Sequence, residues 1–204
     1  DTDRSRGLGD VYKRQVVDTE PIYDIYWNEA GERYQTGIPN FASHIKGTTL
    51  PYILDKYFSD RSEEFKEMVT RESMDFEQKM PFPPVPGAME FIHLLKGKGV
   101  KVGLVTSSDN AKLERAFRLL KLDNLFDTVV SADRITKGKP DPMCYQLAAS
   151  DLHVSPADCL VFEDSFAGIQ AGTNAGMRVI GLSTTNSEES LKDKVYQVIP
   201  DFQN

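Results

Sequence analysis

The sequence predicts an α/β protein whose doubly wound, Rossmann-like parallel sheet carries an inserted all-helical cap domain. Short apolar runs alternate with helical patterns from about residue 88 onward. No alternating strand pattern appears between residues 22 and 83, and that stretch ends in a proline-rich segment. The alternation of strands and helices is typical of a parallel sheet with right-handed crossovers.

Four apolar runs are expected to be strands. They are short, rich in β-branched residues and almost continuously apolar, which suits strands that are buried on both faces of a parallel sheet. The runs cover residues 100–105, 128–130, 159–162 and 178–182.

Helices are expected before and between these strands, because apolar residues recur there at helical spacing. The clearest case is the series Leu113, Ala116, Phe117 and Leu120. Further helices are expected over residues 88–95, from Met143 past Leu147, and over residues 165–176.

The inserted domain is expected over residues 22–83, with amphipathic helices beginning near Ile22, Leu50 and Phe65. The proline-rich residues 80–87 cannot continue a helix, so they indicate a stiff return to the core. This interpretation assigns residues 16–21 and 84–204 to the α/β core domain.

Composition narrows the possible partners and the compartment. The 204 residues carry a net charge of −7 with an isoelectric point near 5.0, which disfavours nucleic acid and anionic membranes as partners. Cys144 and Cys159 have no disulfide or metal-ligand spacing, and no segment is apolar enough to span a bilayer. We therefore expect a monomer in the cytoplasm with reduced thiols.

Polar residues follow the first predicted strand, where a parallel sheet binds ligands. Thr106, Ser107, Ser108 and Asn110 stand at this strand end and lead into a helix. Hydroxyl and backbone N–H donors there can hold a phosphate oxygen. An ordinary helix cap explains the same residues equally well.

Charged residues follow the next two predicted strands. Lys139 precedes a proline and can be directed into a pocket, although a solvated turn explains a single lysine better. Glu163 and Asp164 come directly after a buried run, and neighbouring carboxylates repel each other unless a cation lies between them. Such hard oxygen ligands suit Mg²⁺. A helix N-terminus favours acidic residues and explains Asp164, but it explains Glu163 poorly.

Together these residues resemble the motifs of the haloacid dehalogenase superfamily. Thr106 resembles its second motif, Lys139 in Lys-Pro-Asp-Pro its third, and Glu163-Asp164-Ser165 its fourth. Residues 162–172 are similar to a sequence of the branch that contains sugar-phosphate phosphatases and β-phosphoglucomutase. Residues 17–21 resemble the end of that branch's first motif.

The resemblance implies a Mg²⁺-dependent phosphatase that acts on a small phosphorylated metabolite through an aspartyl-phosphate intermediate. Thr106 would hold the transferring phosphoryl group, and Lys139 would offset the negative charge on the nucleophile and the phosphate. Asp164 would bind Mg²⁺ directly, with Glu163 nearby or acting through water. Substrate contacts are expected from Ser107 (through its backbone), Ser108 and Asn110.

The first motif itself is incomplete. In this branch it reads D-x-D-G-T-x-x-D-T-E, and alignment on Asp18 places the nucleophile at Val11 and the acid–base aspartate at Lys13. Residues 10–15 resemble the translation of a transposon-end adapter used to prepare sequencing libraries. We hypothesise that residues 1 to about 15 are not native and should be left out of reasoning about the fold. The chain should then be inactive and less stable, because its central strand is missing or poorly replaced.

Two other functions remain open. Mutases of the β-phosphoglucomutase type carry a cap arginine after Lys-Gly-x-Ser, but here Leu50 follows the corresponding residues 46–49, which favours hydrolysis. Arg33 or Arg61 could take the place of that arginine. The third possibility is a non-catalytic phosphate-binding protein, which the chain becomes if its nucleophile is lost.

Overall fold

The chain forms two compact units. The computed structural model describes residues 9–12, 16–17, 19–45, 48, 50–108 and 110–203; of residues 9–12 it describes the backbone. One unit comprises Asp1–Asp18 with Phe82–Asn204, and the other comprises Thr19–Pro81. The chain thus leaves the first unit after residue 18 and returns to it at residue 82.

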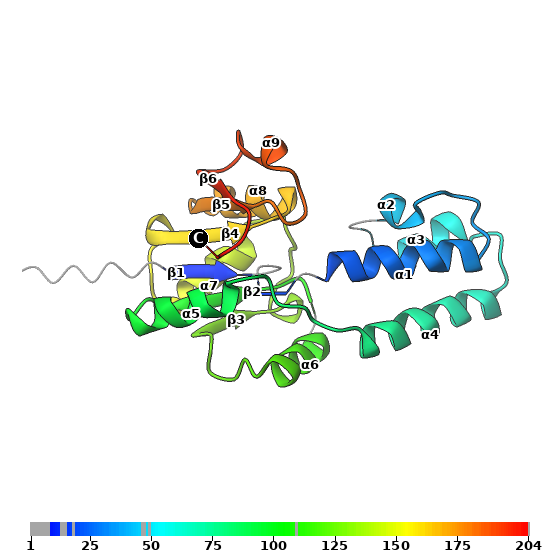
Figure 1. Cartoon of the computed structure of the whole chain (residues 1–204), viewed down its shortest axis with the longest axis horizontal. Coiled ribbons are helices and arrows are strands. Elements are labelled where there is room, and N and C mark those ends of the chain that lie inside the picture. The colour runs from blue at the N-terminus through cyan, green and yellow to red at the C-terminus, as the bar shows by residue number, and fades with distance from the viewer. Residues whose placement is uncertain are drawn as a thin grey trace, which may run out of the picture. The chain divides into compact units, whose positions relative to one another are not determined.

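The first unit is built on a six-stranded sheet in the order β3-β2-β1-β4-β5-β6, and every neighbouring pair is parallel (Figure 1). This order confirms the predicted doubly wound α/β fold. The strands are β1 (Gly9–Tyr12), β2 (Val102–Val105), β3 (Thr128–Val130), β4 (Cys159–Glu163), β5 (Arg178–Leu182) and β6 (Gln197–Ile199).

The central strand β1 comes from residues that the sequence suggested excluding. Its backbone pairs with both β2 and β4, and Val11 lies opposite Gly103 and Val161. These four residues can take the place of the central strand because a strand ladder uses backbone groups that almost any sequence provides. That residues 1–15 are not native stays a prediction. Val11 does not reach the end of the sheet where β4 ends. It lies opposite Val161, and β4 continues for two more residues to Glu163. Lys13 lies outside the described residues.

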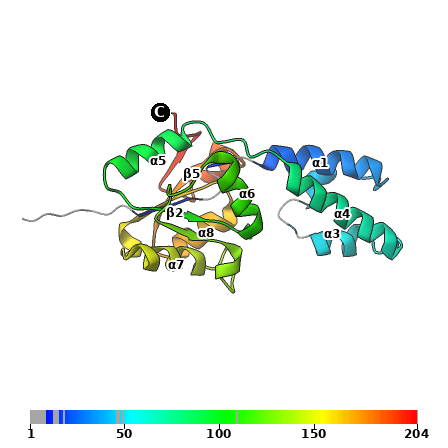
Figure 2. The ribbon, with the colours of Figure 1, turned by 90° about the horizontal axis from the view of Figure 1, so that it is seen from below.

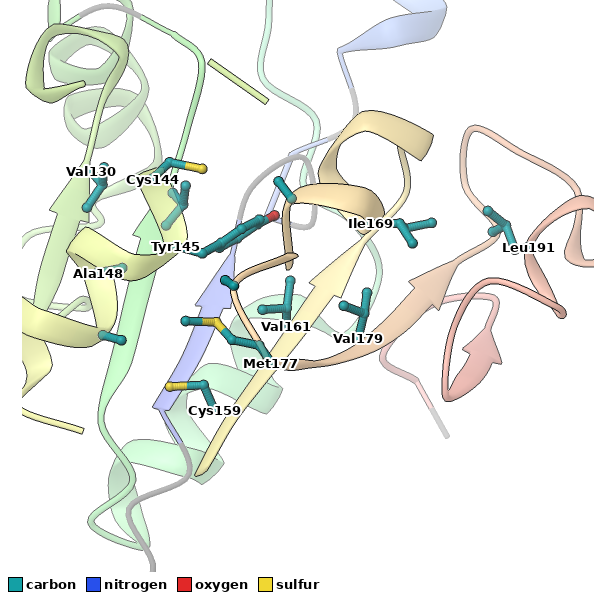
Figure 3. Close-up of a cluster of buried hydrophobic side chains, with 14 residues drawn as sticks. Val130, Cys144, Tyr145, Ala148, Cys159, Val161, Ile169, Met177, Val179 and Leu191 are labelled. Carbon is teal, nitrogen blue, oxygen red and sulfur yellow. The ribbon is translucent and has the colours of Figure 1, made fainter. Parts of the chain in front are cut away.

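Helices cover both faces of the sheet (Figure 2). On one face α5 (Ala88–Gly97) and α6 (Asn110–Leu120) pack over a cluster that includes Leu104 and Phe162. On the other face α7 (Met143–Leu152) and α8 (Phe166–Asn174) pack over a second cluster (Figure 3). Neighbouring strand residues such as Val161 and Phe162 belong to different clusters because strand side chains alternate between faces. The remaining short elements are α9 (Glu188–Leu191) and the 3₁₀ turns Ala132–Arg134 and Pro156–Asp158.

The second unit contains four helices among its described residues, whereas the sequence predicted three. Its core is a cluster of aromatic and aliphatic side chains around Trp27, Phe41 and Phe58. The sequence analysis missed the short helix α2. This helix packs closely against α1: a Cβ on Gly31 of α1 would lie 2.6 Å from the Cβ of Phe41 of α2. The helices are α1 (Glu20–Arg33), α2 (Phe41–Ile45), α3 (Leu50–Tyr57) and α4 (Glu63–Lys79).

The two segments that lead out of and back into the α/β unit are joined to each other. The Val85 N–H donates to the Val16 carbonyl oxygen at 2.9 Å, and Val17 forms an antiparallel bridge with Pro84. The return segment is therefore anchored on the core unit before α5 begins. Among the helices in the described part of the chain, none has the length and apolar character needed to cross a bilayer.

Candidate active site

The predicted site residues from two strands lie at one edge of the sheet. Thr106 directly follows β2, while Glu163 ends β4 and Asp164 follows it; all three are buried. Leu104 and Phe162 both lie opposite Tyr12 of the strand between them. Thr106 and Asp164 each come two residues later, so they lie at the same height along the sheet. Only β1 separates the two strands, so their ends are roughly 10 Å apart.

Lys139 is brought to the same place by an ion pair. Its Nζ donates a hydrogen bond to Glu163 Oε1, and the two side chains are only 10% and 3% exposed. The Nζ also lies 4.9 Å from the centre of the Tyr145 ring. A solvated turn lysine is therefore excluded. An ammonium has three N–H donors, and among the residues described none accepts a hydrogen bond from the other two.

Glu163 uses both of its oxygens inside the protein. Oε1 accepts from Lys139 and from the Tyr145 hydroxyl at 3.3 Å. Oε2 accepts from the backbone N–H groups of Asp164 and Ser165, at 2.8 and 3.2 Å, and from the Ser165 hydroxyl at 3.4 Å. Burial alone would raise the pKa of Glu163, but the charge of Lys139 and these hydrogen bonds lower it to about 2. The Glu163 carboxylate is thus ionised, and both of its oxygens already accept hydrogen bonds.

The sequence after β4 provides the space for this carboxylate. A Cβ on Gly168 would lie 1.7 Å from Glu163 Oε1, so only glycine leaves room for the carboxylate there. The Ser165 hydroxyl accepts from the Gly168 N–H at 3.1 Å and caps the start of α8. The Glu-Asp-Ser-x-x-Gly spacing therefore has a local physical reason.

Asp164 is held by a loop that the sequence analysis missed. The Thr185 hydroxyl donates to Asp164 Oδ2 at 2.5 Å, and the Asn186 side-chain N–H donates to the Asp164 carbonyl at 2.7 Å. Both residues follow β5 closely. The sequence analysis looked for polar residues after the other three predicted strands. The same search after the fourth, residues 178–182, would have identified Thr185 and Asn186.

The loop after β2 is fixed partly by its own hydroxyl. Thr106 Oγ1 accepts from the Ser108 N–H at 3.0 Å, and the Thr106 N–H donates to the Val130 carbonyl at 2.7 Å. The backbone N–H of Asn110 donates to Asp133 Oδ2 at 2.8 Å. Asp133 therefore accepts from the Asn110 N–H at the N-terminus of α6. Thr106, Ser107 and Ser108 directly follow the end of β2.

The described residues do not make a magnesium site by themselves. Among them, no group of three histidine, cysteine or acidic side chains is placed to share a metal ion. Glu163 is already engaged by Lys139, which leaves Asp164 as the candidate ligand at the end of β4. The motif alignment expects two further acids at positions 11 and 13, where this chain has Val11 and Lys13.

The two arginines that might hold a second phosphate both have partners within the helical unit. Arg33 lies 3.1 Å from Glu72 and donates to the Tyr34 hydroxyl at 3.4 Å. Arg61 donates to the Tyr34 carbonyl at 3.3 Å and stacks over Phe65. The mutase alternative therefore stays open, with Arg33 half-exposed.

The chain is similar to known hydrolases over most of its length. Residues 16–182 match the model of the family described as haloacid dehalogenase-like hydrolase. A phosphorylated carbohydrates phosphatase of Thermotoga maritima is 32% identical over 176 residues, which cover 82% of this chain and 80% of that protein. A β-phosphoglucomutase of Bacillus subtilis is 31% identical over 181 residues, which cover 82% of this chain and 78% of that protein.

The fold is shared more widely than the sequence. A HAD hydrolase (family IA, variant 3) structure from Entamoeba histolytica superposes with a TM-score of 0.79 at 22% identity, covering 96% of this chain and 93% of that one. The chain spans only 51% and 11% of the lengths of two further curated relatives. From its matched residues, the chain belongs to the haloacid dehalogenase-like hydrolase family, in the branch that contains sugar-phosphate phosphatases and β-phosphoglucomutases.

Proposed function

We propose that the chain represents a Mg²⁺-dependent phosphatase of small phosphomonoesters, such as sugar phosphates, that works through an aspartyl-phosphate intermediate. We further propose that the chain with Val11 and Lys13 lacks turnover. One observation carries the proposal: Lys139 places a nearly buried ammonium at the sheet edge with two N–H donors that no described residue fills. A desolvated cation with open donors is a site for an anion.

Thr106 supports the same ligand. Its oxygen already accepts from the Ser108 N–H, so its own proton is left to donate outward. A phosphate group offers several acceptor oxygens, which matches a hydroxyl from β2 and an ammonium held at the end of β4. We assign substrate contacts to the Ser107 backbone and to Ser108, and we keep Asn110 as a contact through its exposed side chain.

We assign magnesium dependence to the chain whose first motif carries aspartates at positions 11 and 13, with Asp164 as a further ligand. The family model begins to match at residue 16, which supports the hypothesis that residues 1–15 are not native. The genomic sequence upstream of the Val16 codon tests it. An unbroken native gene that encodes these fifteen residues would refute it.

The function is tested by rebuilding the first motif. The substitutions Val11→Asp, Lys13→Asp, Arg14→Gly and Gln15→Thr create Asp-Tyr-Asp-Gly-Thr, and phosphate release is measured with Mg²⁺ on sugar phosphates and nucleotides. The restored chain is expected to exceed the present chain by at least about 10³-fold. The matched control carries Val11→Asn with the other three changes and should stay inactive. Comparable turnover by the unrestored chain would overturn the assignment of the nucleophile.

The same assay separates the alternatives. A mutase, the activity named for the Bacillus subtilis relative, would move phosphate between two positions of a hexose rather than release it. A phosphate-binding protein would bind inorganic phosphate in the unrestored chain and gain no turnover on restoration. We further propose a cytoplasmic location, in keeping with the two buried cysteines Cys144 and Cys159. We also propose a monomer, which size-exclusion chromatography with light scattering tests.

A further inference from the structure

Tyr145 contacts both members of the buried ion pair, and no family motif points to it. It lies in the first turn of α7 and is 1% exposed. Its hydroxyl donates to Glu163 Oε1 at 3.3 Å, and its ring centre lies 4.9 Å from Lys139 Nζ. Figure 3 shows the side chain extending from α7 with the hydroxyl at its far end.

The hydroxyl is a permanent donor in this environment. A buried phenol needs a hydrogen-bond partner, and among the described residues Glu163 is the partner of Tyr145. Burial and the negative charge of Glu163 raise the pKa of Tyr145 well above its usual value near 10. The Tyr145 hydroxyl therefore acts as the donor and the Glu163 carboxylate as the acceptor of this hydrogen bond.

The ring acts on the other partner. A lysine ammonium on a flexible four-carbon stem has several positions open to it, and one hydrogen bond to Glu163 does not fix its direction. The electron-rich face of an aromatic ring attracts a cation, most strongly where water is excluded. The Tyr145 ring therefore restricts the ammonium from a second side, while Gly168 and the backbone after β4 fix the carboxylate.

We propose that Tyr145 is a positioning residue that holds Lys139 and Glu163 together, so that the two remaining N–H donors of Lys139 face the phosphate. The identity of that ligand rests on the function proposed above. The contact to the ion pair does not, because it is made within the protein.

The first test reads the ammonium directly in the present chain. The chain is labelled with ¹⁵N-lysine, and the Nζ signal of Lys139 is assigned by its loss in Lys139→Met. Its hydrogen exchange with water should be slow, because the group is ion-paired and nearly buried. Tyr145→Phe, which keeps the ring, should accelerate this exchange about threefold. Tyr145→Leu, which loses both contacts, should accelerate it at least about tenfold.

A matched control comes from the helical unit. The Tyr34 hydroxyl donates to Glu72 at 2.7 Å, and Tyr34→Phe removes a similar hydrogen bond elsewhere. It should leave Lys139 exchange unchanged. Unchanged exchange in both Tyr145 variants overturns the proposal. If Tyr145→Leu fails to fold, Tyr145→Phe decides alone, and an unchanged rate in that variant overturns it.

The second test uses the chain with the restored first motif. There Tyr145→Phe should lower kcat about tenfold with little change in KM, because Lys139 is misplaced when charge develops on the phosphoryl group. If the restored chain is inactive while Lys139 exchange still responds, the proposed function fails and the positioning stands. If the restored chain is active and Tyr145→Phe retains its kcat, KM and Lys139 exchange rate, the positioning fails and the function stands.

Discussion

Each unit of the chain contains a cation, a glutamate and a tyrosine in nearly the same arrangement. In the α/β unit, Tyr145 donates to Glu163, and Lys139 lies 4.9 Å from the tyrosine ring. In the helical unit, Tyr34 donates to Glu72, and Arg33 lies 5.1 Å from the tyrosine ring. The two clusters therefore use the same contacts.

The clusters differ in burial and in what they leave open. The side chains of Lys139 and Glu163 are 10% and 3% exposed, whereas those of Arg33 and Glu72 are 51% and 38% exposed. Arg33 and Glu72 join α1 to α4 in contact with water, so any open donor is solvated. Lys139 is nearly buried, and two of its N–H donors have no acceptor among the described residues, a cost that a bound anion would offset. The two clusters thus differ in burial rather than in the kinds of residue present, and we propose that burial makes the Lys139 cluster the anion site.

The largest effect is expected from breaking the buried pair. Glu163→Gln leaves the Lys139 ammonium buried without its counter-charge, and this should lower the free energy of unfolding by about 3–5 kcal/mol. Urea unfolding at pH 7 measures it. Lys139→Met combined with Glu163→Gln is the control and should recover part of the loss, because no uncompensated lysine remains. Equal losses in the single and the double variant would contradict a coupled pair.

Acid should weaken the same pair. The folded pKa of Glu163, about 2, is below the ordinary value of 4.5. Its contribution to stability is therefore complete above about pH 4.5 and is lost as the pH falls toward 2. Glu163→Gln should flatten this part of the stability–pH curve.

A smaller effect is expected from filling the space beside the pair. Gly168→Ala would place a Cβ against a carboxylate that five donors hold in position, so it should cost about 1–3 kcal/mol. Urea unfolding and the Lys139 exchange rate both measure it. The control is Gly97→Ala at the end of α5, where a Cβ meets nothing within 4 Å. That change should be neutral or stabilise by up to about 1 kcal/mol.

Much of the α/β unit could be predicted from the sequence. Strands buried on both faces are apolar runs, so the predicted residues 128–130 and 178–182 coincide with β3 and β5. The rule that ligands bind beyond strand ends led to Thr106 and Glu163 before any contact was known. That Lys139 is buried against Glu163 could not be predicted, because a turn lysine looks the same in sequence whether it is solvated or paired.

The missed features share a cause, which is that their signal is not local. The strand β1 is stabilised by pairing with β2 and β4 rather than by its own Gly-Asp-Val-Tyr sequence. The strand β6 has only three residues and is the last strand of the sheet, paired with β5. Tyr145 has the pattern of an ordinary core residue of α7. The fold places Glu163, at the end of β4, within hydrogen-bonding distance of the Tyr145 hydroxyl, and the sequence around Tyr145 does not indicate this contact.

The smallest effect is expected in the helical unit. Arg33→Ala removes a half-exposed ion pair and some contact with the Tyr34 ring, so it should cost less than about 1 kcal/mol and cost even less at high salt. Urea unfolding at low and high salt measures this. A loss as large as that of Glu163→Gln would show that the two clusters stabilise equally, and burial would then not distinguish them. In the restored chain Arg33→Ala should leave KM for a sugar monophosphate unchanged, because Glu72 and Tyr34 already engage the guanidinium. A selective rise of KM for a hexose bisphosphate would instead assign Arg33 to a second phosphate and favour the mutase.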